Sequence, residues 1–244
     1  MTEASSGIKN ALHGELTNEL EKHVGQKHKF SMGIQRYIGT NKPCYSISAS
    51  SRKEMLRKWL LDHRNLTCEE YRELLLSLAQ GESHEEISLV GALLGAFPKL
   101  RGILLEPEIL NELLERTEGW AEVDSIAQSN FTAREILADW ERWRKVILEL
   151  SENSNAHKRR AALVILTMPV REARDQHLAN LAFQLIEKLK GEKDILITKA
   201  ISWILRDLIK NFREEVEEYL KDKGDTLPAI ARREVKRKLE TGRK

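Results

Sequence analysis

The 244-residue chain has few cysteines and no long apolar run, and each absence excludes a class of protein. Its two cysteines, Cys44 and Cys68, lie far apart without a CxxC pair or clustered histidines, so we expect neither a disulfide framework nor a zinc site. No stretch approaches the roughly 18 apolar residues that a membrane-spanning helix needs. The first residues also lack the basic and then apolar pattern of a signal peptide. We therefore expect a cytoplasmic protein without a membrane anchor.

Motifs of common catalytic chemistries are also missing. The sequence has no glycine-rich phosphate loop, no HExxH, no GxSxG and no paired-carboxylate motif. Nucleotide hydrolysis, metalloproteolysis and serine hydrolysis therefore have no support, and we expect neither a metal nor an organic cofactor.

Charge is present in both signs but is unevenly distributed. The net charge is only +2, yet residues 229–244 carry seven Lys or Arg against two acids, and five Lys or Arg occur in each of the segments 51–64 and 157–174. Three basic blocks in a near-neutral chain are able to build one cationic face, as a binder of the phosphate backbone requires. A solvated helical surface explains the same blocks.

Helical patterns run through most of the chain. Apolar residues recur at 3.6-residue spacing in Tyr71, Leu74, Leu75 and Leu78; in Ile87, Val90, Leu94 and Phe97; in Trp143, Val146, Ile147 and Leu150; and in Ile201, Ile204, Leu205 and Leu208. Such stripes predict amphipathic helices. Capping boxes that start helices are predicted at Ser51–Glu54, Thr67–Glu70, Ser83–Glu86 and Thr132–Glu135.

The regular helix starts predict an all-α fold. Two helices with their turns occupy about 32 to 40 residues, the length of a HEAT-like repeat, so we expect residues 1–244 to form one α-solenoid of tandem antiparallel helix pairs with a concave cleft. A non-repeating helical bundle stays as the alternative. Residues 1–7 are expected to be flexible, and residues 27–50, the least regular part, to contain one short helix and a loop.

Aromatic residues beside charges are the strongest sign of a site. Trp120 and Asp124 are four residues apart, so a helix would project their indole and carboxylate from one face. Trp203 lies in another helical stretch, although a tryptophan is more often a core anchor than a ligand platform. Trp140 and Trp143 are interpreted as packing residues because an apolar stripe follows them.

Several segments together resemble one known family. "GWAEVDSIA", "HKRRAALVIL", "ITKAISWILRDLIKNFREEVEEYL" and "LPAIARREVKRKL" are similar, in order and spacing, to the signatures of the DNA alkylation repair family, the HEAT-like repeat DNA glycosylases of the AlkD type. The likeness is clear over residues 120–239, and "QRYIGTNKPCYSISASSRKEML" extends it weakly toward the N-terminus.

The resemblance implies which residues work on DNA. In that family DNA lies in the concave cleft, and two Trp and an Asp surround the deoxyribose of an alkylated nucleotide while an Arg holds a nearby phosphate. By motif, the catalytic residues would be Trp120, Asp124 and Trp203, and the DNA-binding residues would be Arg160, its neighbours Lys158 and Arg159, and the N-terminal aromatic Tyr37. Thr167 and Met168 stand where the family can place a basic residue, which weakens a second DNA contact there.

The chemistry of alkylated purines suits this small set of groups. An N7-alkylguanine or N3-alkyladenine is a cation and leaves the sugar as a neutral base without a general acid. Asp124 would then stabilise the oxocarbenium ion and orient water. The resemblance therefore implies a monomeric DNA glycosylase of base excision repair that acts on double-stranded DNA. A non-catalytic binder of DNA structures and a protein scaffold stay as alternatives.

Overall fold

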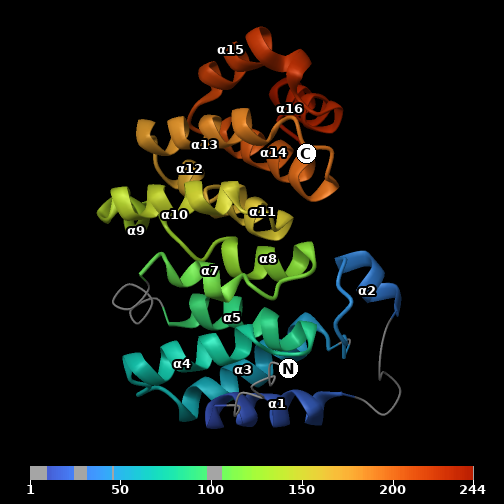
Figure 1. Ribbon diagram of the computed structural model, residues 1–244, viewed down its shortest axis with the longest axis vertical. Helices are drawn as coiled ribbons and strands as arrows, with labels where there is room; N and C mark the ends of the chain where they lie inside the picture. The colour runs from blue at the N-terminus through green and yellow to red at the C-terminus, as the bar shows by residue number, and fades with distance from the viewer. Residues whose placement is uncertain (1–9, 25–31, 46, 98–105, 244) are drawn as a thin grey trace, which may run out of the picture. The chain divides into compact units, whose positions relative to one another are not determined.

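The structure is a computed structural model that describes residues 10–24, 32–45, 47–97 and 106–243 (Figure 1). Its regular elements are all helices, and no strand occurs in these ranges. The chain divides into two compact units, one with residues 1–105 and 115–122 and the other with residues 106–114 and 123–244.

In the residues described, the N-terminal unit contains five helices and the start of a sixth. They are α1 (Ala11–His23), α2 (Met32–Ile38), α3 (Ala49–Asp62), α4 (Cys68–Ala79), α5 (His84–Ala96) and the first turn of α8 (Trp120–Ala127). Helix α1 packs on α3 and α4, and α4 packs on α5. Helix α2 stands apart from this stack (Figure 1) and has an exposed surface, with Met32 78% and Tyr37 73% exposed.

The C-terminal unit is also built from packed helices. It contains α7 (Ile109–Leu113), the rest of α8, α9 (Ala133–Ala138), α10 (Trp140–Glu152), α11 (Ala156–Ile165), α12 (Pro169–Glu172), α13 (Gln176–Leu189), α14 (Ile195–Leu208), α15 (Arg213–Lys223), the 3-10 turn η1 (Gly224–Thr226) and α16 (Ala229–Thr241). Helix α11 packs on α10 and α14, and α14 packs on α16. Successive helix pairs, α10 with α11 and α13 with α14, therefore form successive layers of this unit (Figure 1).

The predicted apolar stripes form the cores of both units. The stripe residues on α4, the residues Val146, Ile147 and Leu150 on α10, and the four stripe residues on α14 are fully buried. Trp143 is 5% exposed and its ring centroid lies 5.0 Å from that of Phe131. Its interpretation as a packing residue is confirmed. Half-buried Trp140 lies against His177 of α13, with ring centroids 5.3 Å apart.

Three of the four predicted capping boxes are confirmed. In Thr67–Glu70, Ser83–Glu86 and Thr132–Glu135, the hydroxyl accepts from the backbone N–H of the glutamate and the carboxylate accepts from the backbone N–H of the cap. The capping box predicted at Ser51–Glu54 is wrong. Helix α3 begins three residues earlier, where the Ser48 hydroxyl accepts from the backbone N–H of Ser51, and Glu54 pairs with Lys58 one turn further along at 3.0 Å.

The all-α fold class is confirmed, and so is a short helix within residues 27–50, which is α2. The expected flexible start, residues 1–7, lies outside the described residues. The single domain and the concave cleft stay predictions. None of the helices in the described ranges is long and apolar enough to cross a membrane.

Candidate functional site

The short helix α8 carries both Trp120 and Asp124, one turn apart, as their spacing predicts. Trp120 opens the helix and is half-buried, whereas Asp124 is only 8% exposed. The two side chains therefore occupy different environments, which are set by different partners.

At the start of α8, Trp120 is held against Tyr37 of α2. The indole Nε1 donates to the backbone carbonyl of Tyr37 at 2.9 Å. The two ring centroids lie 5.5 Å apart at an interplanar angle of 88°, an edge-to-face arrangement that aromatic pairs favour. Because Tyr37 is 73% exposed, the pair presents an aromatic surface to solvent.

Two glycines allow the backbones on either side of this pair to touch. A Cβ on Gly119 would lie 2.3 Å from the carbonyl oxygen of Ile38, which is closer than atoms can approach. Gly39 follows α2 with a φ of +77°, a left-handed conformation that glycine adopts without steric cost. The end of α2 therefore lies directly against the start of α8.

Further along α8, Asp124 forms a buried ion pair with Arg160 of α11. Arg160 Nε donates to Asp124 Oδ1 at 2.9 Å and Arg160 Nη2 donates to Oδ2 at 2.7 Å. Arg160 is 5% exposed, and its Nη1 donates to the backbone carbonyl of Leu196 at 2.7 Å. The bidentate geometry fixes the plane of the carboxylate and links α8 to the first turn of α14.

Burial and Arg160 act on the pKa of Asp124 in opposite directions. Loss of hydration raises this pKa and is the larger effect, while the hydrogen bonds and the positive charge of Arg160 lower it. The net result is a pKa above the ordinary value of 3.8. A buried acid stabilised by one cation is the kind of perturbed group that often marks a functional site.

Trp203 lies on α14, two turns after Leu196, and is half-buried. On the same helix, the Ser202 hydroxyl donates to the Glu234 carboxylate of α16 at 2.6 Å, and the Arg206 guanidinium donates to the same carboxylate. These contacts fix α14 against α16. The participation of Trp203 in one site with Asp124 stays a prediction.

The cations beside Arg160 are engaged with the protein. Lys158 is 5% exposed. Arg159 makes two hydrogen bonds of 2.8 Å to Glu192 and two more to the backbone carbonyls of Asn153 and Ser154. These contacts do not favour a phosphate role for Lys158 or Arg159, and their assignment to DNA binding stays a prediction.

Sequence reasoning missed a buried charged cluster next to Trp120. Lys42 is 6% exposed and lies among Glu118, Glu122 and the backbone carbonyl of Arg116, while Glu122 also faces His84. Two acids four residues apart, Glu118 and Glu122, were a visible signal around Trp120. Their partner Lys42 is 80 residues from Glu122, which no local pattern reveals.

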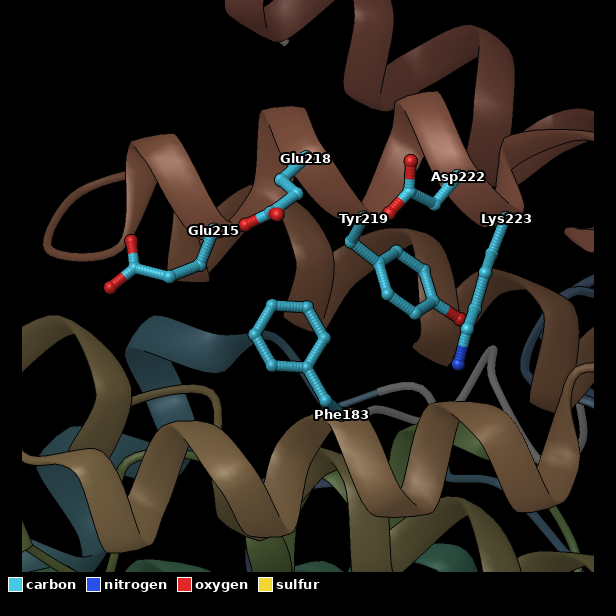
Figure 2. A pocket seen from close by; sticks show the side chains of 6 residues that line it. All are labelled: Phe183, Glu215, Glu218, Tyr219, Asp222 and Lys223. Atoms are coloured by element: carbon cyan, nitrogen blue, oxygen red, sulfur yellow. The ribbon is translucent and has the colours of Figure 1, made fainter.

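A separate pocket in the C-terminal unit has the opposite charge from a DNA site. Its volume is about 220 Å³, and it is lined by Phe183, Glu215, Glu218, Tyr219, Asp222 and Lys223. Figure 2 shows the Phe183 ring rising from α13 toward the side chains of α15. Its three carboxylates would repel phosphate, so this pocket is not assigned to DNA.

Comparison with known proteins identifies the family of the chain. A family model described as DNA alkylation repair enzyme matches residues 16–239. The chain belongs to this family. Membership places it among the enzymes that repair alkylated DNA, and DNA is therefore its substrate class.

A solved structure supports the same fold. It is described as a predicted DNA alkylation repair enzyme from Enterococcus faecalis, with a TM-score of 0.71 and 18% sequence identity over 89% of this chain and 100% of that one. No curated protein sequence matches the chain. At this identity the likeness establishes the helical fold, while the roles of individual residues rest on their own geometry.

Proposed function

We propose that this DNA alkylation repair enzyme is a DNA glycosylase that hydrolyses the N-glycosidic bond of cationic alkylated purines, N7-alkylguanine and N3-alkyladenine, in duplex DNA. One observation carries the proposal: the buried Asp124 carboxylate, oriented by Arg160 and one turn from Trp120. A carboxylate beside an aromatic ring is suited to stabilise a sugar cation.

The reaction needs little from the protein because the lesion is already charged. When the bond between the sugar C1′ and the base nitrogen breaks, its electron pair neutralises the cationic base, which leaves without a proton donor. Positive charge develops on the sugar as an oxocarbenium ion. Water then adds through its oxygen to C1′ and releases a proton, and the products are the free base and an abasic sugar.

Asp124 supplies the countercharge in this scheme. A carboxylate about 4 Å from the cation at an effective dielectric near 20 contributes roughly 4 kcal/mol, about a thousandfold in rate. The charge of Arg160 offsets part of this, so the figure is an upper bound. Arg160 contributes in return by keeping the buried carboxylate ionised and oriented.

Aromatic rings provide the second part of the proposed site. The negative faces of Trp120 and Trp203 would stabilise the sugar cation by roughly 0.5–2 kcal/mol each and would exclude bulk water. Tyr37, whose edge-to-face contact with Trp120 leaves it largely exposed, would contact the DNA beside the alkylated nucleotide.

Arg160 retains the capacity for its second proposed role, contact with a DNA phosphate. A guanidinium carries five N–H donors, and the bonds to Asp124 and to the carbonyl of Leu196 use three. A phosphate that approached the remaining donors would share this arginine with Asp124. Substrate binding and orientation of the carboxylate would then depend on one side chain.

Release of free base from methylated duplex DNA tests the proposal. The wild-type protein should release N7-methylguanine or N3-methyladenine, and the Asp124→Asn variant should not do so at a comparable rate. DNA binding without release would favour the non-catalytic binder, and absence of DNA binding would favour the scaffold.

Lesion charge should decide which adducts are released. Because the proposed mechanism has no proton donor for the leaving base, a duplex with one N7-methylguanine should be cleaved and a matched duplex with one uracil should not. A bulky N7-alkylguanine, also a cation, should be accepted if the base stays outside an enclosing pocket. Efficient uracil release would contradict the mechanism, and refusal of the bulky cation would indicate an enclosed pocket.

A further inference from the structure

The cluster around Lys42 connects three segments of the N-terminal unit. Lys42 Nζ donates to the backbone carbonyl of Arg116 and lies 3.4 Å from Glu122 Oε2 and 3.3 Å from Glu118 Oε1. The Lys42 side chain is 5% exposed and that of Glu122 is fully buried. The buried ammonium of Lys42 thus joins the segment that follows α2 to the residues at the start of α8.

Glu122 is the centre of this cluster. Its Oε2 accepts from the backbone N–H of Glu118 at 2.9 Å, and its Oε1 lies 3.3 Å from His84 Nδ1. His84 belongs to the first turn of α5, and its backbone N–H donates to the carbonyl of Pro43 at 2.9 Å. Burial acts to raise the pKa of Glu122, but the bonds from His84 and Glu118 and the charge of Lys42 lower it overall.

The same cluster fixes the chain on both sides of the aromatic pair. Gln35 Nε2 on α2 donates to the backbone carbonyl of Lys42 at 2.7 Å. Glu118 Oε2 accepts from the backbone N–H of Asn41 at 2.8 Å. Tyr37 lies on α2, as Gln35 does, and Trp120 lies two residues after Glu118. The pair is joined directly by its ring contact and by the bond from the Trp120 indole to the Tyr37 carbonyl, and the cluster holds the two backbone segments that carry the rings.

Stability alone does not explain buried charges at this place. Well-packed apolar residues of similar volume are often as stabilising as a buried ion pair. The exposed Tyr37 ring also buries little surface that would hold α2 against α8. Directional contacts from Lys42 and Glu122 provide an orientation that apolar packing would leave less defined.

We propose that Lys42 and Glu122 are positioning residues, which hold Tyr37 and Trp120 in the geometry that receives the alkylated nucleotide. The inference rests on the proposed glycosylase function for its effect on rate. Neither side chain contacts DNA in this proposal. Loss of the cluster should misplace the aromatic pair, and small displacements of groups that position a substrate commonly cost about 10-fold or more in rate.

The experiment compares Lys42→Met with Lys42→Arg, in single-turnover base release and in DNA affinity. Lys42→Met should lower the release rate about 10-fold or more, with a smaller change in affinity, and Lys42→Arg should recover most of the rate. Incorporated 5-fluorotryptophan gives a second readout, because Trp120→Phe assigns the Trp120 signal among the five tryptophans. That signal should shift or broaden in Lys42→Met.

A double variant separates positioning from stability. Combining Lys42→Met with Glu122→Gln removes both charges, so it should recover much of the stability lost by Lys42→Met without recovering the release rate. His13→Leu is the matched control, because His13 and Glu86 form a buried pair in the same unit with nitrogen and oxygen 2.9 Å apart. This control should lose stability while the Trp120 signal and the release rate of the folded fraction stay unchanged.

The outcomes distinguish the inference from the proposed function. A wild-type protein without base release would overturn the glycosylase, while a Trp120 signal that responds to Lys42→Met would still support positioning. An unchanged Trp120 signal in Lys42→Met, or a double variant with the full wild-type rate, would overturn the positioning role.

Discussion

Glu122 and Asp124 lie two residues apart on α8, and both are buried acids, yet their environments differ. Glu122 receives contacts from Lys42, from His84 and from the backbone N–H of Glu118, and its pKa is lowered. Asp124 is bonded by Arg160, and its pKa is raised because burial outweighs that partner. An acid surrounded by several donors is fitted to hold a structure together, whereas an acid with one cation is more easily perturbed by a bound substrate.

The largest expected effect comes from removing the cation beside Asp124. Arg160→Ala would leave a buried carboxylate unpaired, so we expect a loss of about 3–5 kcal/mol in the free energy of unfolding, measured by urea denaturation. Arg142→Ala is the matched control. Arg142 makes a similar pair of bonds to Glu108 with both side chains nearly half exposed, and its loss should have a much smaller effect because water screens the exposed pair.

The same variant tests the phosphate contact. If Arg160 binds one DNA phosphate, the slope of log affinity against log salt should become shallower by about one unit in Arg160→Ala. Substitutions of Lys or Arg in residues 229–244 should weaken affinity more mildly. An unchanged slope would remove Arg160 from the DNA interface and leave it only the orientation of Asp124.

Replacement of Asp124 itself should separate catalysis from binding. Asp124→Asn keeps the shape of the side chain but removes the charge that faces the sugar cation. Base release should fall by roughly 10² to 10³ while DNA affinity changes by only a few fold, as measured by single-turnover kinetics and equilibrium binding. Equal losses in rate and affinity would contradict a role in the transition state.

The sequence predicts features that depend on residues close together in the chain, and it does not predict contacts between distant residues. The caps at Thr67, Ser83 and Thr132 and the shared helix of Trp120 and Asp124 depend on residues three or four apart, and the structure confirms them. The wrong cap at Ser51 shows the limit of this reasoning, because several serines compete there and Ser48 takes the position.

Contacts across the fold could not be read from periodicity. Arg160 and Asp124 are 36 residues apart, so the local pattern that indicates Asp124 could not predict its ion pair with Arg160. The resemblance implies that Arg160 binds a DNA phosphate. The structure shows in addition that Arg160 of α11 bonds the carboxylate of Asp124 on α8. Lys42 carried no signal of burial, because an isolated lysine in a loop is expected to be exposed.

Stability as a function of pH should show opposite trends for the two acids. The lowered pKa of Glu122 contributes stability that is present above its ordinary value of 4.5 and is lost as pH falls through the lower folded value. The raised pKa of Asp124 contributes stability that is present below 3.8 and is lost as pH rises through the higher folded value.

Urea denaturation between about pH 3 and pH 7 checks these signs. The stability advantage of the wild type over Glu122→Gln should shrink toward the acid end, and its advantage over Asp124→Asn should grow there. Base release should also fall as the pH drops through the raised pKa of Asp124. Parallel trends in the two variants would mean that the two carboxylates have equivalent environments.

The smallest effect is expected for Glu118, the third acid of this stretch. Its side chain is 41% exposed, and Oε2 accepts from the backbone N–H of Asn41. Glu118→Gln keeps an oxygen acceptor for that bond and removes one partially exposed charge near Lys42, which retains Glu122 and the backbone carbonyl of Arg116 as partners. The free energy of unfolding should therefore change by less than about 1 kcal/mol, and base release should stay within about twofold of wild type.

The three acids would then be ordered by burial and by number of partners. Asp124 would control the rate, Glu122 the geometry of the aromatic pair, and Glu118 only the local backbone. A Glu118→Gln variant as slow as Lys42→Met would show that the exposed carboxylate, and not buried Glu122, transmits the effect of Lys42 to Trp120. The positioning contact would in that case run through the bond from Asn41 to Glu118 at the edge of the cluster.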